Sequence, residues 1–169
     1  MKSKNPFIHL FCLLLPAVLL CSFTSLPDPV NFSGDWKFDE AKSELGEFGG
    51  RGLSRTLKVE QKEKTISVTR TTPGRDGGDP VVSTLTLAFD GTVAESEGFM
   101  GSKRKSTAKW SDDGKTLTIS NIMNFERDGQ SMEIKGTETW TFTNDGLLSV
   151  VTFSSSPRGD FTTKAIYNK

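Results

Sequence analysis

The chain has 169 residues, and its 21 basic and 21 acidic side chains balance to a formal net charge of zero. This length suits one domain with a buried core, whereas the balanced charge offers no basic face, so we expect no nucleic-acid partner. A hydrophobic content of 34% and 16 glycines exclude a coiled coil, a collagen and a disordered tail, and favour a globular domain rich in turns.

The N-terminal segment has the layout of a secretory signal peptide. Lys2 and Lys4 precede an apolar run over residues 7–20, and small or polar residues follow up to Ser25. The run is short for a membrane crossing, and no later segment reaches about 20 apolar residues, so we expect no integral membrane span. The sequence therefore predicts an exported protein, secreted or periplasmic.

We expect a signal peptide over 1–25 and a single domain over 26–169. Attachment of a lipid to Cys21 is the alternative, which the large Leu20 before it disfavours. The only histidine and both cysteines lie within the leader. The mature domain therefore has no Ser-His-Asp or Cys-His arrangement and no imidazole or thiolate for zinc, and we expect no metal site and no cofactor.

From Asn31 onward, polar and apolar residues alternate with a period of two, which is typical of half-buried strands. Five Asp-Gly pairs interrupt the alternation and indicate tight hairpins. A short helix is expected over Glu40–Phe48, with Asp39 as its N-cap. The predicted strands cover residues 32–39, 53–61, 64–72, 81–89, 92–97, 103–111, 115–126, 131–143, 147–155 and 161–168.

The predicted hairpins support one another. A two-residue turn at 128–129 places Phe125 opposite Met132 and Leu117 opposite Trp140, so that the apolar side chains share one face. Short links favour an antiparallel up-and-down meander of about 8–10 strands, and closure into a barrel hides both the apolar face and the edges. A Greek-key sandwich is the alternative, but it needs a long return connection.

The opening Phe32-Ser-Gly34-Asp-Trp36-Lys resembles the Gly-x-Trp start of lipocalins and the Phe-x-Gly-x-Trp-Lys start of fatty-acid-binding proteins. The chain is also similar to secreted bacterial lipocalin-like proteins that begin Phe-Ser-Gly-x-Trp-Lys. This resemblance implies a calycin-type barrel with an interior. It also implies structural roles for Gly34 and Trp36, with Trp36 closing one end of the barrel and Lys164 stacking on it.

The closing strand departs from the fatty-acid-binding pattern. In that family an Arg two residues before the closing Tyr points inward with it and binds a carboxylate. Here Ala165 stands two residues before Tyr167, and Lys164 falls on the other face. We expect Tyr167 to contact a ligand or to make a structural hydrogen bond.

Several charged or polar residues are expected on the apolar face. Glu138 lies opposite Ile119 and diagonal to Asn121, and Arg104 lies opposite Met123. A hairpin near 62–63 would place Arg55 opposite Arg70, where an anion would relieve their repulsion. Glu138 either orients a ligand or neutralises an interior arginine. The candidate ligand-binding residues are Arg55, Arg70, Arg104, Asn121, Glu138 and Tyr167.

The sequence therefore favours a barrel that binds a small, partly apolar ligand. Arginines in the interior would favour an anionic ligand. The alternative is a barrel filled by its own side chains, which acts as a structural or protein-interaction module. An enzyme would need carboxylate, arginine or tyrosine chemistry inside the barrel, and we do not expect one. The oligomeric state is left open by the sequence.

Overall fold

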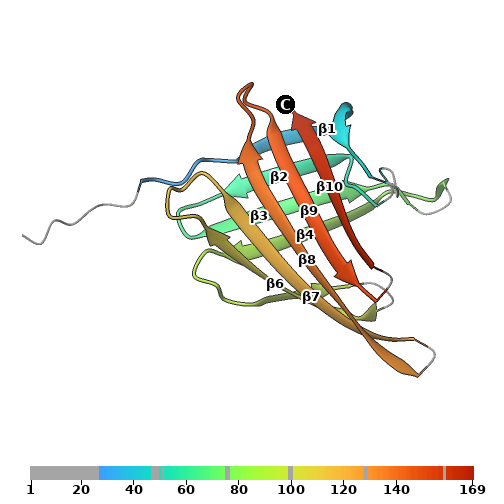
Figure 1. The fold of residues 1–169 in the computed structure, drawn as a ribbon. Helices are drawn as coiled ribbons and strands as arrows, with labels where there is room; N and C mark the ends of the chain where they lie inside the picture. Colours follow the sequence, from blue (N-terminus) through green and yellow to red (C-terminus); the bar gives the residue numbers. More distant parts are fainter. Residues whose placement is uncertain are drawn as a thin grey trace, which may run out of the picture.

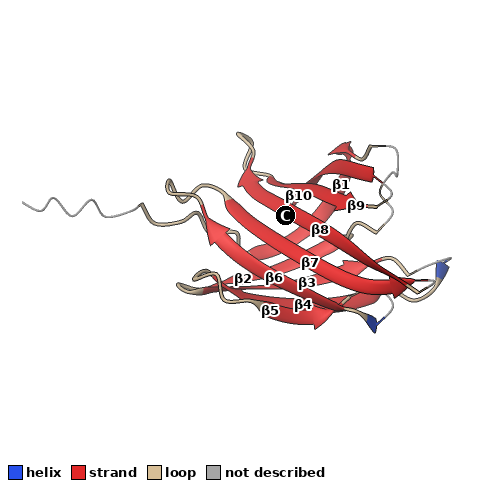
Figure 2. Ribbon diagram, turned by 60° about the horizontal axis from the view of Figure 1, so that its bottom comes forward, coloured by secondary structure: helices blue, strands red, loops and turns tan. Residues whose placement is uncertain are grey.

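The computed structural model describes residues 27–46, 50, 52–74, 77–98, 101–127, 129–157 and 159–169. The expected leader over 1–25 lies outside these ranges. Within them, ten antiparallel strands form a single sheet that curls into a nearly closed barrel (Figures 1 and 2). The strands are β1 (Gly34–Glu44), β2 (Thr56–Gln61), β3 (Thr65–Thr72), β4 (Val81–Ala88), β5 (Ala94–Glu97), β6 (Lys103–Trp110), β7 (Leu117–Arg127), β8 (Gln130–Phe142), β9 (Leu148–Ser156) and β10 (Gly159–Asn168).

The strand order is that of a meander whose first and last strands meet. The sheet runs β4-β3-β2-β1-β10-β9-β8-β7-β6-β5, with β1 and β10 paired in its middle. Strands β4 and β5 stand at its two ends, and no ladder joins them among the described residues. The predicted up-and-down barrel is therefore confirmed, except that a seam is left between β4 and β5.

The hairpin registers read from the sequence are also confirmed for β6, β7 and β8. Phe125 pairs with Met132 and Leu117 with Trp140. Arg104 pairs with Met123. Because side chains alternate along a strand, these pairs fix which residues of the three strands face the interior.

The predicted register between β2 and β3 is wrong by two residues. Leu57 pairs with Arg70, and Arg55 lies before the start of β2, so the two arginines do not face each other. The turn lies one residue later than expected, at 63–64, because Gln61 pairs with Ile66 and the amide of Lys62 bonds the carbonyl of Thr65 at 2.8 Å. A shift of two residues preserves the inward face, so Arg70 still points into the barrel.

The predicted helix over 40–48 is also corrected where the structure describes it. Residues 40–44 continue β1, and the pairing with β10 shifts register between Asp39 and Glu44. The Ser43 hydroxyl donates to the carbonyl of Asp39 at 2.6 Å, and this local bond holds the irregularity. The end of the expected helix, residues 47–48, lies outside the described residues.

The core occupies the end of the barrel where the chain enters β1. Phe32 and Trp36 are 0% and 2% exposed, and the indole nitrogen of Trp36 donates to the carbonyl of Phe32 at 2.9 Å. The rings of Phe32 and Trp110 stack at 5.6 Å. These aromatic side chains close this end of the barrel, as predicted for Trp36. Buried around them are Leu57, Ile66, Leu87, Leu117, Trp140 and Leu148.

Candidate functional site

The interior of the barrel has two unlike halves. Inward side chains around Trp36 are fully buried, whereas several of those farther along the same strands are charged and partly exposed. The side chains of Arg70 and Glu138 keep 21% and 17% exposure, and Arg104 is exposed although its register faces it inward. We call this second part the open half; it runs from Glu138 to the tip of the β7–β8 hairpin.

Arg70 and Glu138 form an ion pair across the interior of the open half. The Nη2 of Arg70 donates to the Oε2 of Glu138 at 2.7 Å. The same oxygen accepts a hydrogen bond of 2.9 Å from the indole Nε1 of Trp140, and the Arg70 guanidinium lies 5.6 Å from the Trp140 ring centre. Glu138 thus does pair with an interior arginine, as one of the two predicted roles requires.

The surroundings of Glu138 keep it ionised. Burial opposes its ionisation, but the charge of Arg70, the hydrogen bonds from Trp140 and Arg70, and the charge of Arg104 together outweigh it, so the pKa of Glu138 lies below its ordinary value of 4.5. Its other oxygen, Oε1, has no partner among the described residues. The carboxylate therefore retains a free acceptor in the interior.

Arg104 is a second cation beside this pair. It stands on β6 opposite Met123 and makes no ion pair with the part of the chain that the structure describes. Its charge nevertheless contributes to the lowered pKa of Glu138, so its guanidinium acts on the same interior space. Glu138 neutralises Arg70 alone, so the charge of Arg104 is left in excess there.

Tyr167 makes a structural hydrogen bond, which was one of its two predicted roles. Its hydroxyl donates to the carbonyl of Ser54 at 3.2 Å, and the residue is 2% exposed. Burial, with a smaller contribution from the charge of Glu138, raises the pKa of Tyr167 to about 12 against the opposing charges of Arg70 and Arg55. Tyr167 thus lies near the charged groups, but its hydroxyl proton is used in a hydrogen bond within the protein.

Arg55 lies at the rim of the barrel rather than among these groups. Its guanidinium is 5.1 Å from the ring centre of Phe38, and it pairs with Glu40 at 3.5 Å, with 46% of its side chain exposed. Arg55 therefore adds little to the interior charge.

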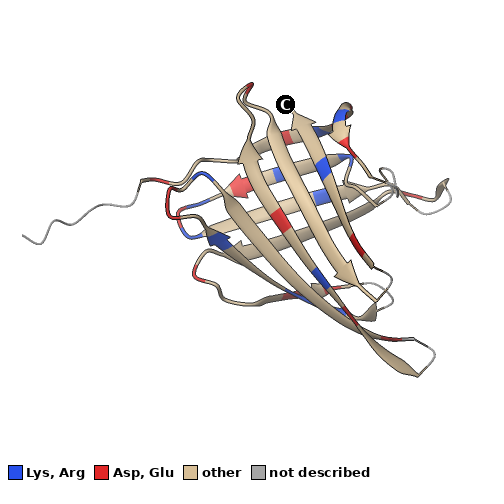
Figure 3. Ribbon diagram, viewed as in Figure 1, with Lys and Arg blue, Asp and Glu red and all other residues tan. Residues whose placement is uncertain are grey.

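Figure 3 shows acidic and basic residues interspersed over the strands, with neither sign forming a continuous patch in that view.

The predicted contact of Lys164 with Trp36 is also corrected. Lys169 provides the cation instead, with its Nζ 5.0 Å from the ring centre of Trp36, whereas Lys164 pairs with Glu44 at 2.9 Å. Gly34 leaves room for this arrangement, because a Cβ there would lie 3.2 Å from Cε of Lys169 and its φ of +147° is rare for other residues. The predicted structural roles of Gly34 and Trp36 fit these contacts.

A polar row next to Glu138 was only partly predicted. Asn121 was expected there and pairs with Ser106 on one side and Gly136 on the other. Ser106 is 1% exposed, and its hydroxyl has no hydrogen-bond partner among the described residues. Alternation from Arg104 and Ala108 already places Ser106 inward, so the pattern contained the signal that would have identified it.

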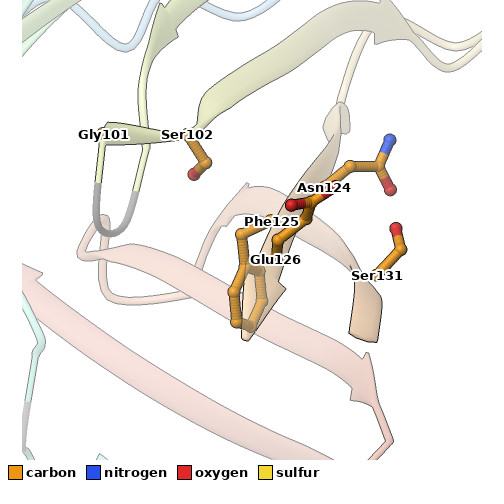
Figure 4. Close-up of a pocket in the computed structure, with 6 residues that line it drawn as sticks. All are labelled: Gly101, Ser102, Asn124, Phe125, Glu126 and Ser131. Carbon is orange, nitrogen blue, oxygen red and sulfur yellow. The ribbon is translucent and has the colours of Figure 1, made fainter. Parts of the chain in front are cut away.

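Two cavities are described, and neither is lined by Arg70 or Arg104. The larger, about 470 Å³, lies between the start of β6 and the β7–β8 hairpin, at the end of the barrel away from Trp36 (Figure 4). Phe125 and Asn124 point to opposite sides of β7 there. The smaller, about 260 Å³, lies outside the closed end beside Asn31 and Gln61. The larger cavity is lined by Gly101, Ser102, Asn124, Phe125, Glu126 and Ser131.

Clusters of metal-binding side chains and membrane-spanning helices are both absent from the described ranges. No group of three or more histidine, cysteine or acidic side chains is placed there to hold a metal ion. None of the helical turns in those ranges is long and apolar enough to cross a membrane.

Comparison with known proteins defines the class of fold. No protein-family model and no curated protein sequence matches the chain. Among solved structures, the chain is similar to zebrafish ileal bile acid-binding protein, determined in complex with cholic acid, with a TM-score of 0.52. The match covers 82% of this chain and 98% of that one at 16% sequence identity.

The protein therefore has an up-and-down β-barrel fold similar to that of bile acid-binding protein, as its meander predicted. At this identity the likeness concerns the fold alone. The more specific resemblance to secreted bacterial lipocalin-like proteins stays a prediction.

Proposed function

We propose that the protein is an exported, non-enzymatic carrier that binds a small amphipathic anion in the open half of its barrel. The observation that carries this proposal is the excess cation: Arg104 faces the interior without an ion pair, beside a carboxylate that Arg70 already neutralises. A guanidinium in a confined interior gains from a carboxylate or sulfate partner, because such a pair forms charge-assisted hydrogen bonds.

The side chains beyond Arg104 suit an apolar body. On the inward face of β7 and β8, the pairs Met123–Ile134 and Phe125–Met132 lead from the charged groups toward the hairpin tip. On β10, Phe161 faces inward and keeps 37% exposure. A ligand with its acidic group at Arg104 and Arg70 would therefore place its apolar part along these side chains, toward the open end.

Glu138 is suited to holding charge rather than to transferring protons. A general acid or base works best when its pKa lies near the working pH, but the pKa of Glu138 is lowered and both its donors, Arg70 and Trp140, stabilise the ionised form. The bile acid ligand of the zebrafish protein with this fold belongs to the proposed class, since it joins an acidic group to an apolar body.

The test is calorimetric titration of the protein with tetradecanoate, cholate and uncharged tetradecanol. We expect both anions to bind and tetradecanol to bind at least tenfold more weakly. Arg104→Ala should weaken binding of both anions about tenfold or more, since hydrogen bonds to charged groups are worth about 1.5–3 kcal/mol. The matched control is Lys103→Ala. Lys103 directly precedes Arg104 on β6, and its side chain is 77% exposed and pairs with Glu95.

The alternative, a filled barrel acting through its surface, is favoured by a different observation. Glu138 and Tyr167 are satisfied by protein partners, and neither described cavity contacts Arg70 or Arg104. Failure of both anions to bind would select this alternative. Export is a separate part of the proposal that rests on residues 1–25, and the N-terminal residue of the protein recovered from its source would test it.

A further inference from the structure

Three polar groups without partners among the described residues stand at neighbouring inward positions of β6, β7 and β8. The Ser106 hydroxyl is buried and unpaired, and a buried hydroxyl without a hydrogen bond costs about 1–3 kcal/mol. The Asn121 amide lies directly across from it and makes no hydrogen bond with the described residues. The third group is Oε1 of Glu138, whose two donors both use Oε2.

Gly136 shapes the space among these groups. A Cβ at Gly136 would lie 2.7 Å from Oδ1 and 3.0 Å from Nδ2 of Asn121, so the amide occupies the place that a side chain there would fill. Glu138 follows two residues along β8 on the same face, within diagonal reach of Asn121. The absence of a side chain at Gly136 thus lets the Asn121 amide lie over β8, on the strand that carries Glu138.

The donors and acceptors at this position match a hydroxyl group. A ligand hydroxyl accepts one hydrogen bond from the Ser106 hydroxyl or the Asn121 amide, and donates its own proton to Oε1 of Glu138 or Oδ1 of Asn121. A plain hydrocarbon would leave all of these groups unpaired. Binding at this position therefore requires a hydroxyl on the ligand, whereas a general preference for an apolar anion would not.

Arg104 fixes the distance of that hydroxyl from the acidic group. Arg104 and Ser106 are two residues apart on one face of β6, about 7 Å along the strand. Both residues stand on the inward face of β6, with Arg104 opposite Met123 and Ser106 opposite Asn121. A carboxylate held by Arg104 would therefore have its neighbouring carbons beside the Ser106 hydroxyl.

From this arrangement we infer that Ser106, Asn121 and Glu138 form a hydroxyl-recognition subsite, which selects acids that carry a hydroxyl close to their carboxylate. The inference rests on the proposed function and deepens it, because it names the ligand class. These ligands are acids with an apolar tail and a hydroxyl close to the carboxylate. Ser106 and Asn121 are then specificity-determining residues, and Gly136 positions the amide.

The experiment compares 3-hydroxytetradecanoate with tetradecanoate by calorimetry. Wild type should bind the hydroxy acid about five- to tenfold more tightly, the gain expected from one or two hydrogen bonds. Ser106→Ala should abolish most of this preference and leave tetradecanoate binding unchanged. Gly136→Ala, which displaces the Asn121 amide, should also reduce the preference. Ser120→Ala, an exposed serine on the outer face of β7, is the matched control and should retain it.

A second readout guards against misfolding. Without ligand, Ser106→Ala should unfold in urea at the same or a higher concentration than wild type, because it removes an unpaired buried hydroxyl. Equal affinity of wild type for the two acids, or a preference retained in Ser106→Ala, would overturn the inference while leaving the proposed function intact. Binding of neither acid would overturn both.

Discussion

Arg70 on β3 and Glu138 on β8 meet at 2.7 Å although 68 residues separate them in the chain. Four strands, β2, β1, β10 and β9, lie between β3 and β8 in the order of the sheet. Strands of a sheet are about 4.8 Å apart, so this contact would be impossible in a flat sheet and is made across the interior. The ion pair therefore links two opposite walls of the barrel.

Removing the charge of Glu138 should destabilise the protein. In Glu138→Gln the amide can still accept from Trp140, but the Arg70 guanidinium loses its anion in a largely buried position. We expect the free energy of unfolding in urea at pH 7 to fall by about 2 kcal/mol. Glu133→Gln on the same strand is the control, because its pair with Lys135 is exposed and should contribute less than about 0.5 kcal/mol. Equal losses in the two variants would contradict this role.

The same carboxylate should contribute to acid sensitivity. Because folding lowers the pKa of Glu138 below 4.5, its contribution to stability is complete above that pH and is lost as the pH falls through the lowered value. Urea denaturation between pH 7 and pH 3 should show wild type losing stability more steeply below about pH 4.5 than Glu138→Gln. Parallel curves for the two proteins would show that Glu138 is not held in its ionised form.

Tyr167 offers a direct test of burial, since it is the only tyrosine in the chain. Its absorbance near 295 nm should titrate with a pKa of about 12 in the folded protein and near 10 in urea. The raised pKa means that the neutral hydroxyl favours folding below pH 10, and that this contribution is lost as the pH rises toward 12. A folded-state titration near 10 would indicate a tyrosine open to solvent.

Tyr167→Phe should remove the hydrogen bond to the carbonyl of Ser54 and reduce stability by about 1 kcal/mol at pH 7. The ring itself stays in contact with Phe38, at 5.8 Å between ring centres, so the barrel should remain folded. Urea denaturation measures the loss, and the variant should no longer show the stability decrease above pH 10. A variant as stable as wild type would mean that the hydroxyl contributes nothing.

The closed end of the barrel predicts different roles for two lysines of the last strand region. Lys169→Ala should cost about 0.5–1 kcal/mol, because the cation lies over the Trp36 ring. Lys164→Ala should cost less than about 0.5 kcal/mol, because its pair with Glu44 is exposed. Both are measured by urea denaturation, and the reverse order of losses would favour the assignment of Lys164 that the sequence suggested.

Most of the fold could be predicted because strand alternation and tight turns are local signals. Phe125–Met132 and Arg104–Met123 follow from counting residues across Asp-Gly turns. The β2–β3 register was missed because the turn lies at 63–64, one residue later than expected, and no Gly marks its position. The segment after Asp39 was expected to be helical because Asp39 can act as an N-cap, yet pairing with β10 keeps residues 40–44 extended.

The site could be predicted as a set of inward residues but not as a set of contacts. Period two placed Glu138 and Arg104 inside, whereas the approach of Arg70 to Glu138 depends on how the sheet closes, which no local pattern encodes. Trp140 was expected to be core, and its indole nitrogen also bonds Glu138 two residues away. Ser106 was overlooked because serine is common on outer faces, and only its burial without a partner draws attention to it.

The position of the seam determines where the chain tolerates a break. Strands β4 and β5 are consecutive in sequence but share no ladder within the described ranges, whereas the first and last strands, β1 and β10, pair in the middle of the sheet. Cleavage of the link over 89–93 would leave every described ladder intact, while loss of β10 would divide the sheet into two fragments. A circular permutant opened at that link, with its original ends joined, would keep its ladders and fold through more local pairing.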